Sequence, residues 1–122
     1  MISKLENEQI KVIGVYRSQD GDVRNLSMIL RDLADSKKTV VIGGDMNLCA
    51  LTQGNNLVTR SLVEMGFKQL VTEATHTDGR AIDHVYLRTS KNTRFDWTLE
   101  HMPKYYSDHD GIGLTVWKSF KN

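Results

Sequence analysis

Three short stretches of the sequence place acidic, amide and imidazole side chains where a predicted strand begins or ends. The stretch "GGDMN" contains Asp45 and Asn47, "AIDHVYL" contains Asp83, and "YSDHDGI" contains Asp108 and His109. These residue types serve acid–base catalysis and the binding of divalent cations. Strand ends along one edge of a sheet are also where α/β proteins collect ligand-binding groups. Together the stretches predict a catalytic or binding site.

Each stretch also has an ordinary structural interpretation. Asp45 and Asn47 are typical turn residues at a strand exit, and Asp108 can cap a turn. A serine hydrolase triad of Ser107, Asp108 and His109 is a poor alternative, because consecutive residues rarely reach the required geometry and the chain has no G-x-S-x-G motif. Asp83, inside an apolar strand, is costly to bury unless it is paired, which favours a partner such as His109.

Hydrophobic periodicity predicts the elements that position these residues. Strands are expected over 10–16, 38–44, 67–71, 81–88, 95–101 and 111–120. One amphipathic helix is expected from an N-cap at Asp22 to about Ala34, and a second over 56–65 with Gly66 at its C-cap. Helices between the early strands and hairpins between the later ones predict the α/β (α+β) class. Because Asp83 and its neighbour alternate across a strand, His84 must face away from any site that Asp83 faces.

Composition sets broad limits. A chain of 122 residues is expected to form a single domain over 1–122 with one core. The net charge of +1 gives no strong electrostatic signal, so binding of nucleic acid would depend on a local patch. Cys49 is the only cysteine and is expected to be a small buried side chain. With no intramolecular disulfide, signal peptide or membrane-length apolar stretch, an intracellular (nuclear or cytoplasmic) location is expected.

Taken in order, "GGDMN", "IDHVYL" and "YSDHDGI" resemble the endonuclease/exonuclease/phosphatase superfamily of metal-dependent phosphodiesterases and phosphatases. The phrase "GFKQLVTEATHTDGRAIDHVYL" followed by "YYSDHDGI" is most similar to mobile-element endonucleases and their host-encoded relatives, which include apurinic endonucleases. The resemblance runs from about Val12 to Trp117. It implies half of a two-layer α/β sandwich, the C-terminal half, with a mixed sheet and two helices on one face.

The resemblance also implies roles for individual residues. Asp45 matches the aspartate that orients or deprotonates the attacking water, and Asn47 matches the amide that hydrogen-bonds the phosphoryl group. His109 matches the histidine at the scissile phosphate, and Asp83 the carboxylate that holds its imidazole in one tautomer. Asp108 matches a residue at or near the divalent metal, which would be Mg²⁺ or Mn²⁺.

Other residues have weaker assignments. Tyr16 matches the tyrosine whose hydroxyl meets the phosphate, although a tyrosine at a strand end most often packs with its hydroxyl in water. His76 and Arg80 are possible substrate contacts, although a surface histidine and a solvated arginine are equally ordinary. His84 and His101 are expected to be structural.

One family feature lacks a counterpart. The first half of the family fold supplies a metal-binding glutamate after an apolar strand, and neither Glu6 nor Glu8 occupies such a position. We therefore expect a truncated domain with a bare apolar sheet face, formed by "GIGLTVWKSF" and "AIDHVYL". That face would be covered in a homodimer or by a polypeptide that supplies the missing half. The expected function is metal-dependent phosphodiester hydrolysis, endonuclease-like and on DNA rather than RNA. The alternative is a catalytically deficient phosphate or nucleic-acid binding module, or a mobile-element relic.

Overall fold

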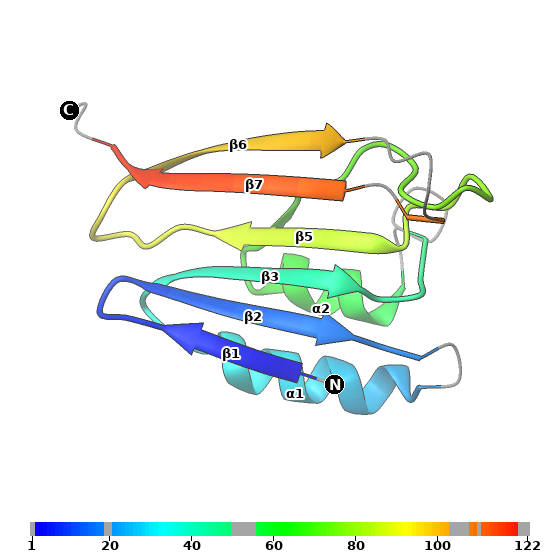
Figure 1. Ribbon diagram of the computed structural model, residues 1–122. Coiled ribbons are helices and arrows are strands. Elements are labelled where there is room, and N and C mark those ends of the chain that lie inside the picture. Colours follow the sequence, from blue (N-terminus) through cyan, green and yellow to red (C-terminus); the bar gives the residue numbers. More distant parts are fainter. Residues whose placement is uncertain (1, 19–20, 50–55, 103–107, 110, 120–122) are drawn as a thin grey trace.

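Figure 1 shows the computed structural model, which describes residues 2–18, 21–49, 56–102, 108–109 and 111–119. The elements follow the order β1 (Ile2–Glu6), β2 (Ile10–Tyr16), α1 (Val23–Ala34), β3 (Thr39–Asp45), α2 (Leu57–Glu64), β4 (Lys68–Gln69), β5 (Asp83–Arg88), β6 (Phe95–Met102) and β7 (Gly111–Lys118). Ser107 lies outside the described residues. Within them, neither helix is long and apolar enough to cross a membrane.

The main sheet has five strands in the order β1-β2-β3-β5-β4. Strands β2 and β3 are parallel and are joined through α1, whereas the other neighbours pair antiparallel. Strands β6 and β7 form a separate two-stranded antiparallel sheet. This arrangement is a mixed sheet with two helices, which confirms the predicted α+β class and matches half of a two-layer sandwich.

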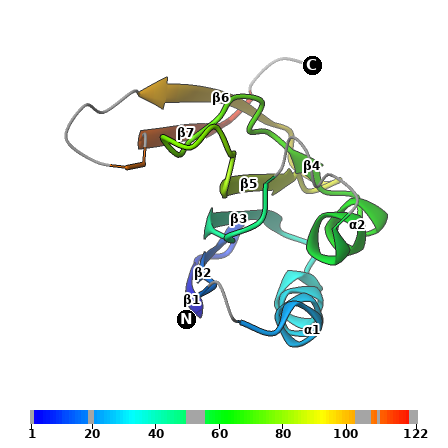
Figure 2. The ribbon, with the colours of Figure 1, turned by 90° about the vertical axis from the view of Figure 1, so that its right-hand side faces the viewer.

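Both helices lie on one face of the main sheet, as Figure 2 shows. The Asp22 carboxylate caps α1 as predicted, because it accepts hydrogen bonds from the backbone N–H groups of Arg24 and Asn25. Helix α1 buries Leu26 and Leu30, one turn apart, against the sheet. The buried residues of this layer are Ile13, Val15, Leu26, Leu30, Ala34, Val40, Ile42, Met46, Val58, Leu62, Phe67 and Tyr86.

The opposite face of the sheet is only partly covered. Val85 and Leu87 of β5 and Val41 of β3 belong to a second buried cluster, against which Trp97, Leu99, Ile112, Leu114 and Val116 of the β6–β7 hairpin pack. The expectation that the apolar faces of 81–88 and 111–120 would both be bare is therefore wrong, because they cover one another within the chain. Toward the other edge of this face, Leu5 (75% exposed) and Val12 (38% exposed) leave apolar surface uncovered.

Two strands differ from the sequence expectation. Strand β1 was not expected, since four of its five residues are exposed. It pairs with β2, and its first residue, Ile2, packs against the helix-side core. Strand β4 is two residues long instead of spanning 67–71. Phe67 closes α2, because its backbone N–H donates to the Leu62 carbonyl, and Gly66 there has the expected positive φ of 93°.

One arginine joins the carboxyl ends of both helices to the sheet. The Arg88 guanidinium on β5 donates to the carbonyls of Met65 (3.1 Å), Ser36 (2.9 Å) and Ala34. It also lies over the Phe67 ring, 4.6 Å from the centroid. A cation at a helix C-terminus offsets the partial negative charge of the unpaired carbonyls. Arg88 is therefore a structural cation.

Candidate active site

Strand register brings three of the predicted site residues into one row. Tyr16 on β2 is the partner of Asp45 on β3, and Asp45 is in turn the partner of Asp83 on β5. Directly opposed residues in neighbouring strands point to the same face of a sheet. The row therefore lies on the face away from the helices, at the edge where β2 and β3 end and β5 begins (Figure 1).

Gly44 allows strands β2 and β3 to approach each other closely just before Asp45. Its φ is 144°, and a Cβ atom there would lie 1.8 Å from the Val15 carbonyl oxygen. No side chain fits that space, so the "GGD" sequence lets β3 stay paired with β2 up to Asp45.

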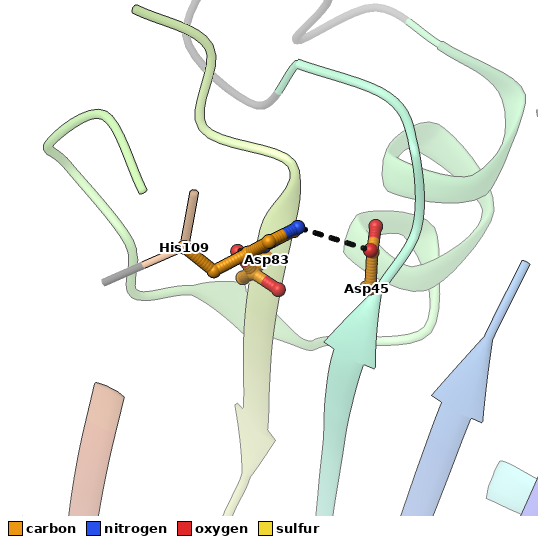
Figure 3. A group of neighbouring side chains, drawn as sticks. All are labelled: Asp45, Asp83 and His109. Carbon is orange, nitrogen blue, oxygen red and sulfur yellow. Dashed lines mark hydrogen bonds and ion pairs between the residues drawn. The ribbon is translucent and has the colours of Figure 1, made fainter. Parts of the chain in front are cut away.

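The His109 imidazole lies between the two carboxylates (Figure 3). Its Nδ1 atom is 2.8 Å from Asp83 Oδ2, and its Nε2 atom is 3.8 Å from Asp45 Oδ2. The backbone holds this position from the 76–80 turn, because Thr77 N–H donates to the Asp108 carbonyl at 2.9 Å and His76 forms a β-bridge with His109. Three residues far apart in the sequence therefore converge on one site.

The Asp83 carboxylate fixes the tautomer of His109. A carboxylate only accepts hydrogen bonds, so the proton lies on Nδ1 and the Nε2 atom faces Asp45. The hydrogen bond to Asp83 raises the pKa of His109 above its ordinary value, partial burial opposes this, and the charges of Asp83, Asp45 and Asp108 add to the rise. The site thus favours the imidazolium, or the Nδ1–H tautomer when neutral.

Asn47 shapes the loop that carries Asp45. Its backbone is left-handed, with φ 50°, and its N–H donates to Asp45 Oδ1 at 3.0 Å. Its side-chain amide donates to the Arg17 carbonyl, and the Arg17 N–H donates to the Asp45 carbonyl at 2.9 Å. One amide hydrogen of Asn47 is thus engaged, whereas the second has no acceptor among the described residues. The Arg17 guanidinium also donates to the Met46 carbonyl at 3.1 Å.

A buried hydrogen-bonded chain supports the same loop from the helix side. His84, on the opposite face from Asp83 as predicted, places Nε2 2.6 Å from the Leu48 carbonyl. The carbonyl accepts, so Nε2 carries the proton and Nδ1 accepts from the Tyr86 hydroxyl at 2.8 Å. Tyr86 in turn accepts from Thr59 Oγ1 at 2.8 Å, and Thr59 accepts from the Asn56 amide at 3.0 Å. Burial lowers the pKa of His84, which keeps it neutral.

The remaining predicted residues lie around this centre. Tyr16 is half-exposed at 51% beside Asp45, and Asp108 is exposed with its carbonyl bound to Thr77. The His76 ring meets His109 edge to face, 5.0 Å between centroids. Arg80 forms an ion pair with Asp78 at 2.8 Å.

Sequence reasoning missed Arg17 and Thr75 as supporting residues. Thr75 is fully buried, and its hydroxyl accepts from the Asp83 N–H at 3.1 Å. No periodic pattern marks either residue, since both act through backbone groups of distant segments.

Asp45, Asp83 and His109 form the group that could hold a metal within the described residues, with one ligand atom from each lying within 4.8 Å of the others. The Asp108 carboxylate is not in this group. Two carboxylates suit Mg²⁺ or Mn²⁺, which commonly use one or two carboxylates with water and substrate phosphate oxygens. Glu6 does not contribute, since its carboxylate pairs with Lys38 at 2.9 Å at the other end of the sheet.

No family model and no curated protein matches the sequence. Four solved chains match the structure. One is CdtB, the biologically active subunit of cytolethal distending toxin, with 17% identity, a TM-score of 0.63, and coverage of 93% of this chain and 51% of that chain. The cytolethal distending toxin structure from Actinobacillus actinomycetemcomitans matches at 16% identity with the same TM-score and coverage.

A third match is the endonuclease domain of TRAS1, a telomere-specific non-LTR retrotransposon. The identity is 14% and the TM-score 0.70, with coverage of 99% of this chain and 64% of that chain. This chain thus spans about half to two thirds of the length of the structures it matches. CdtB and the TRAS1 domain both have DNase I-like folds. The chain therefore shares the DNase I-like fold of these structures, and its sheet with two helices is consistent with half of that two-layer sandwich.

Proposed function

We propose that this chain takes part in metal-dependent hydrolysis of a phosphodiester, as an endonuclease acting on DNA. The observation that carries the proposal is the His109 imidazole, held by Asp83 at 2.8 Å with Nε2 directed toward Asp45. A nuclease-type fold with an acidic cluster at a strand edge is consistent with it.

The residues divide the proton movements between them. Hydrolysis breaks one P–O bond and adds water, whose oxygen becomes bonded to phosphorus and whose proton must leave. In this proposal the Asp45 carboxylate orients that water and accepts its proton, while His109, protonated on Nε2, stabilises the phosphoryl oxygens or donates to the departing oxygen. Bound Mg²⁺ or Mn²⁺ would neutralise phosphate charge and polarise the P–O bond. Asp45 and Asp83 would hold it, with Asp108 close by.

Asn47 and Tyr16 would contact the phosphate. Asn47 keeps one amide hydrogen for an acceptor, and Tyr16 is exposed in the same row as Asp45. His76 and Arg80, on the turn beside His109, are the expected contacts for the flanking nucleotides.

A binding module without catalysis is the second candidate. It is favoured by one observation, namely that the acidic cluster of the described residues contains two carboxylates and receives none from β1. With two carboxylates, the site would hold Mg²⁺ mainly when phosphate oxygens of the ligand complete its coordination, so nucleic acid could bind there with slow hydrolysis or none.

We also propose that the uncovered part of the sheet face is completed by a second copy or by a polypeptide that supplies the other half. Leu5 and Val12 are opposed across β1 and β2 and are both exposed on that face. Sedimentation of the chain at micromolar concentration tests the homodimer, and Val12→Lys should dissociate it. A stable monomer that no partner joins would contradict it.

Nicking of supercoiled plasmid with Mg²⁺ distinguishes the two functions. The chain, His109→Ala and His101→Ala should be compared, with and without EDTA. His101 pairs with Glu73 at 2.8 Å, so its replacement is a matched histidine control outside the site. We expect nicking that EDTA and His109→Ala abolish and His101→Ala preserves. Nicking that survives His109→Ala would refute the proposal that this site is catalytic. DNA binding without nicking would support the non-catalytic binding module.

A further inference from the structure

A cavity lies at the end of the sheet opposite the candidate active site. Its volume is about 940 Å³. Its walls are the segment after α1 (36–38), the end of α2 (64–66), the end of β5 with the following segment (87–92), Lys68 and Trp97. In Figure 1 this is the end toward which the β5 arrow points. At about 3.3 Å per residue along β5, it lies on the order of 15 Å from Asp83.

The cavity concentrates the positive charge of the molecule. Its cationic side chains are those of Lys37, Lys38, Lys68, Arg88 and Lys91, and Glu64 is its one acidic side chain. The whole chain has a net charge of only +1, so the rest of the chain is net acidic. The lining of this cavity therefore attracts an anion more strongly than the edge that carries the Asp45 and Asp83 carboxylates.

The cations of the cavity are not equally available. Arg88 is engaged with the carbonyls of both helix ends, and Lys38 pairs with Glu6 at 2.9 Å. Lys68 stands over the Trp97 ring, 5.7 Å from its centroid. Lys37 and Lys91 have no partner within the described part of the chain. Arg88 already offsets the partial negative charge of the two helix C-termini. The ammonium groups of Lys37 and Lys91 are therefore available to bind a ligand.

We propose that this cavity, which we call the lysine pocket, binds a phosphorylated ligand of nucleotide size that carries two or more phosphate groups. Its volume lies within the range of small-molecule sites, roughly 300–1,000 Å³. Lysine ammonium groups bind phosphate as point charges, and several are needed because one exposed contact is largely screened by water. Leu87 and the Trp97 ring supply an apolar wall for the organic part of the ligand.

Trp97 provides the signal for a direct test. Trp117→Phe leaves Trp97 as the only tryptophan, so its emission reports on the lysine pocket. The protein is titrated in EDTA with inorganic triphosphate, ATP and adenosine, so that no metal can recruit phosphate to the active-site edge. We expect ATP and triphosphate to change the emission saturably and adenosine to have no effect. Raising the salt concentration should weaken binding.

Variants locate the contact. Lys37→Gln with Lys91→Gln should weaken ATP binding by about tenfold or more, because charge-assisted contacts are lost. Lys37→Arg with Lys91→Arg should retain binding, and Lys118→Gln, on β7 outside the pocket, should leave it unchanged. Thermal melting checks that each variant folds.

Two results would overturn the proposal. One is the absence of saturable binding of ATP and triphosphate at millimolar concentration, or equal binding by the Lys37→Gln/Lys91→Gln protein. The other is binding of a single-stranded oligonucleotide through Lys37 and Lys91 when ATP does not bind, which would assign the pocket to a nucleic-acid backbone. The binding of ATP and of the oligonucleotide is measured in EDTA and does not depend on plasmid nicking. This proposal and the proposed nuclease function can therefore fail separately.

Discussion

Asp45 and Asp83 are direct cross-strand partners at the shared end of β3 and β5, with their carboxylates on the same face of the sheet. Like charges in directly opposed positions destabilise a sheet. His109, whose imidazole reaches both carboxylates, offsets part of this repulsion when protonated. A divalent cation would offset it more completely, so stability and ion binding are linked at this position.

Asp45→Asn should stabilise the protein in EDTA by about 0.5–1 kcal/mol and reduce the rise in melting temperature that Mg²⁺ produces. The amide oxygen of the new side chain can still accept from the Asn47 N–H, so the loop is preserved. Calorimetry with and without Mg²⁺ measures both effects. Asp96→Asn, on β6 away from the cluster, is the control. An unchanged Mg²⁺ effect in Asp45→Asn would show that the ion binds elsewhere.

Proton NMR of the histidine rings in EDTA should show His109 titrating above its ordinary pKa and His84 below it. The folded pKa of His109 is raised, so its contribution to stability is present below about pH 6.5 and is lost as the pH rises through the folded pKa. His84 has the opposite sign, and its contribution is lost as the pH falls below about 6.5.

Asp83→Asn should lower the pKa of His109, because the hydrogen bond that His109 donates to Asp83 is the largest cause of the rise. Asp78→Asn removes a carboxylate of the neighbouring turn that pairs with His76 and Arg80, and it should leave the His109 titration in place. If the pKa of His109 is the same in the Asp83→Asn variant, the two side chains are not in contact in solution.

Asn47→Ala and Asn47→Gly separate the backbone role of Asn47 from its amide role. The φ of 50° costs an alanine about 1–2 kcal/mol and a glycine little, so urea unfolding should find Asn47→Gly the more stable variant. Both variants lose the amide that donates to the Arg17 carbonyl. If the amide also contacts phosphate, plasmid nicking should fall in both alike. Equal stability of the two variants would show that the left-handed turn is not populated.

Tyr86 should make the protein sensitive to alkali. Burial raises the pKa of Tyr86 to about 12, so its contribution is full below about pH 10 and is lost between about pH 10 and 12. That contribution corresponds to about 2–3 kcal/mol. Tyr86→Phe should flatten this decline while lowering stability at neutral pH by about 1–3 kcal/mol, since the Thr59–Tyr86–His84 chain is broken. Denaturant unfolding across this pH range measures both, with the half-exposed Tyr16→Phe as the control, in which the decline should persist.

Several features could be predicted from the sequence because they depend on local periodicity. Alternation along 81–88 places Asp83 and His84 on opposite faces, as observed. The helical spacing and the N-cap Asp22 defined α1. The position of Asp45 at a strand end followed from the length of the apolar run before it, whereas Asp83, expected inside the strand over 81–88, is the first residue of β5.

Tertiary structure alone decided which of these segments meet. Strand β1 is ordered by its pairing with β2, and the β6–β7 hairpin covers Val85 and Leu87 where a bare face had been expected. The capture of the Asn47 amide by the Arg17 carbonyl likewise joins two separate loops. Periodicity assigns each side chain to a face, but register and pairing depend on contacts between distant segments. The sequence therefore pointed to the residues of the candidate site, and the fold determined that Asp45, Asp83 and His109 lie together.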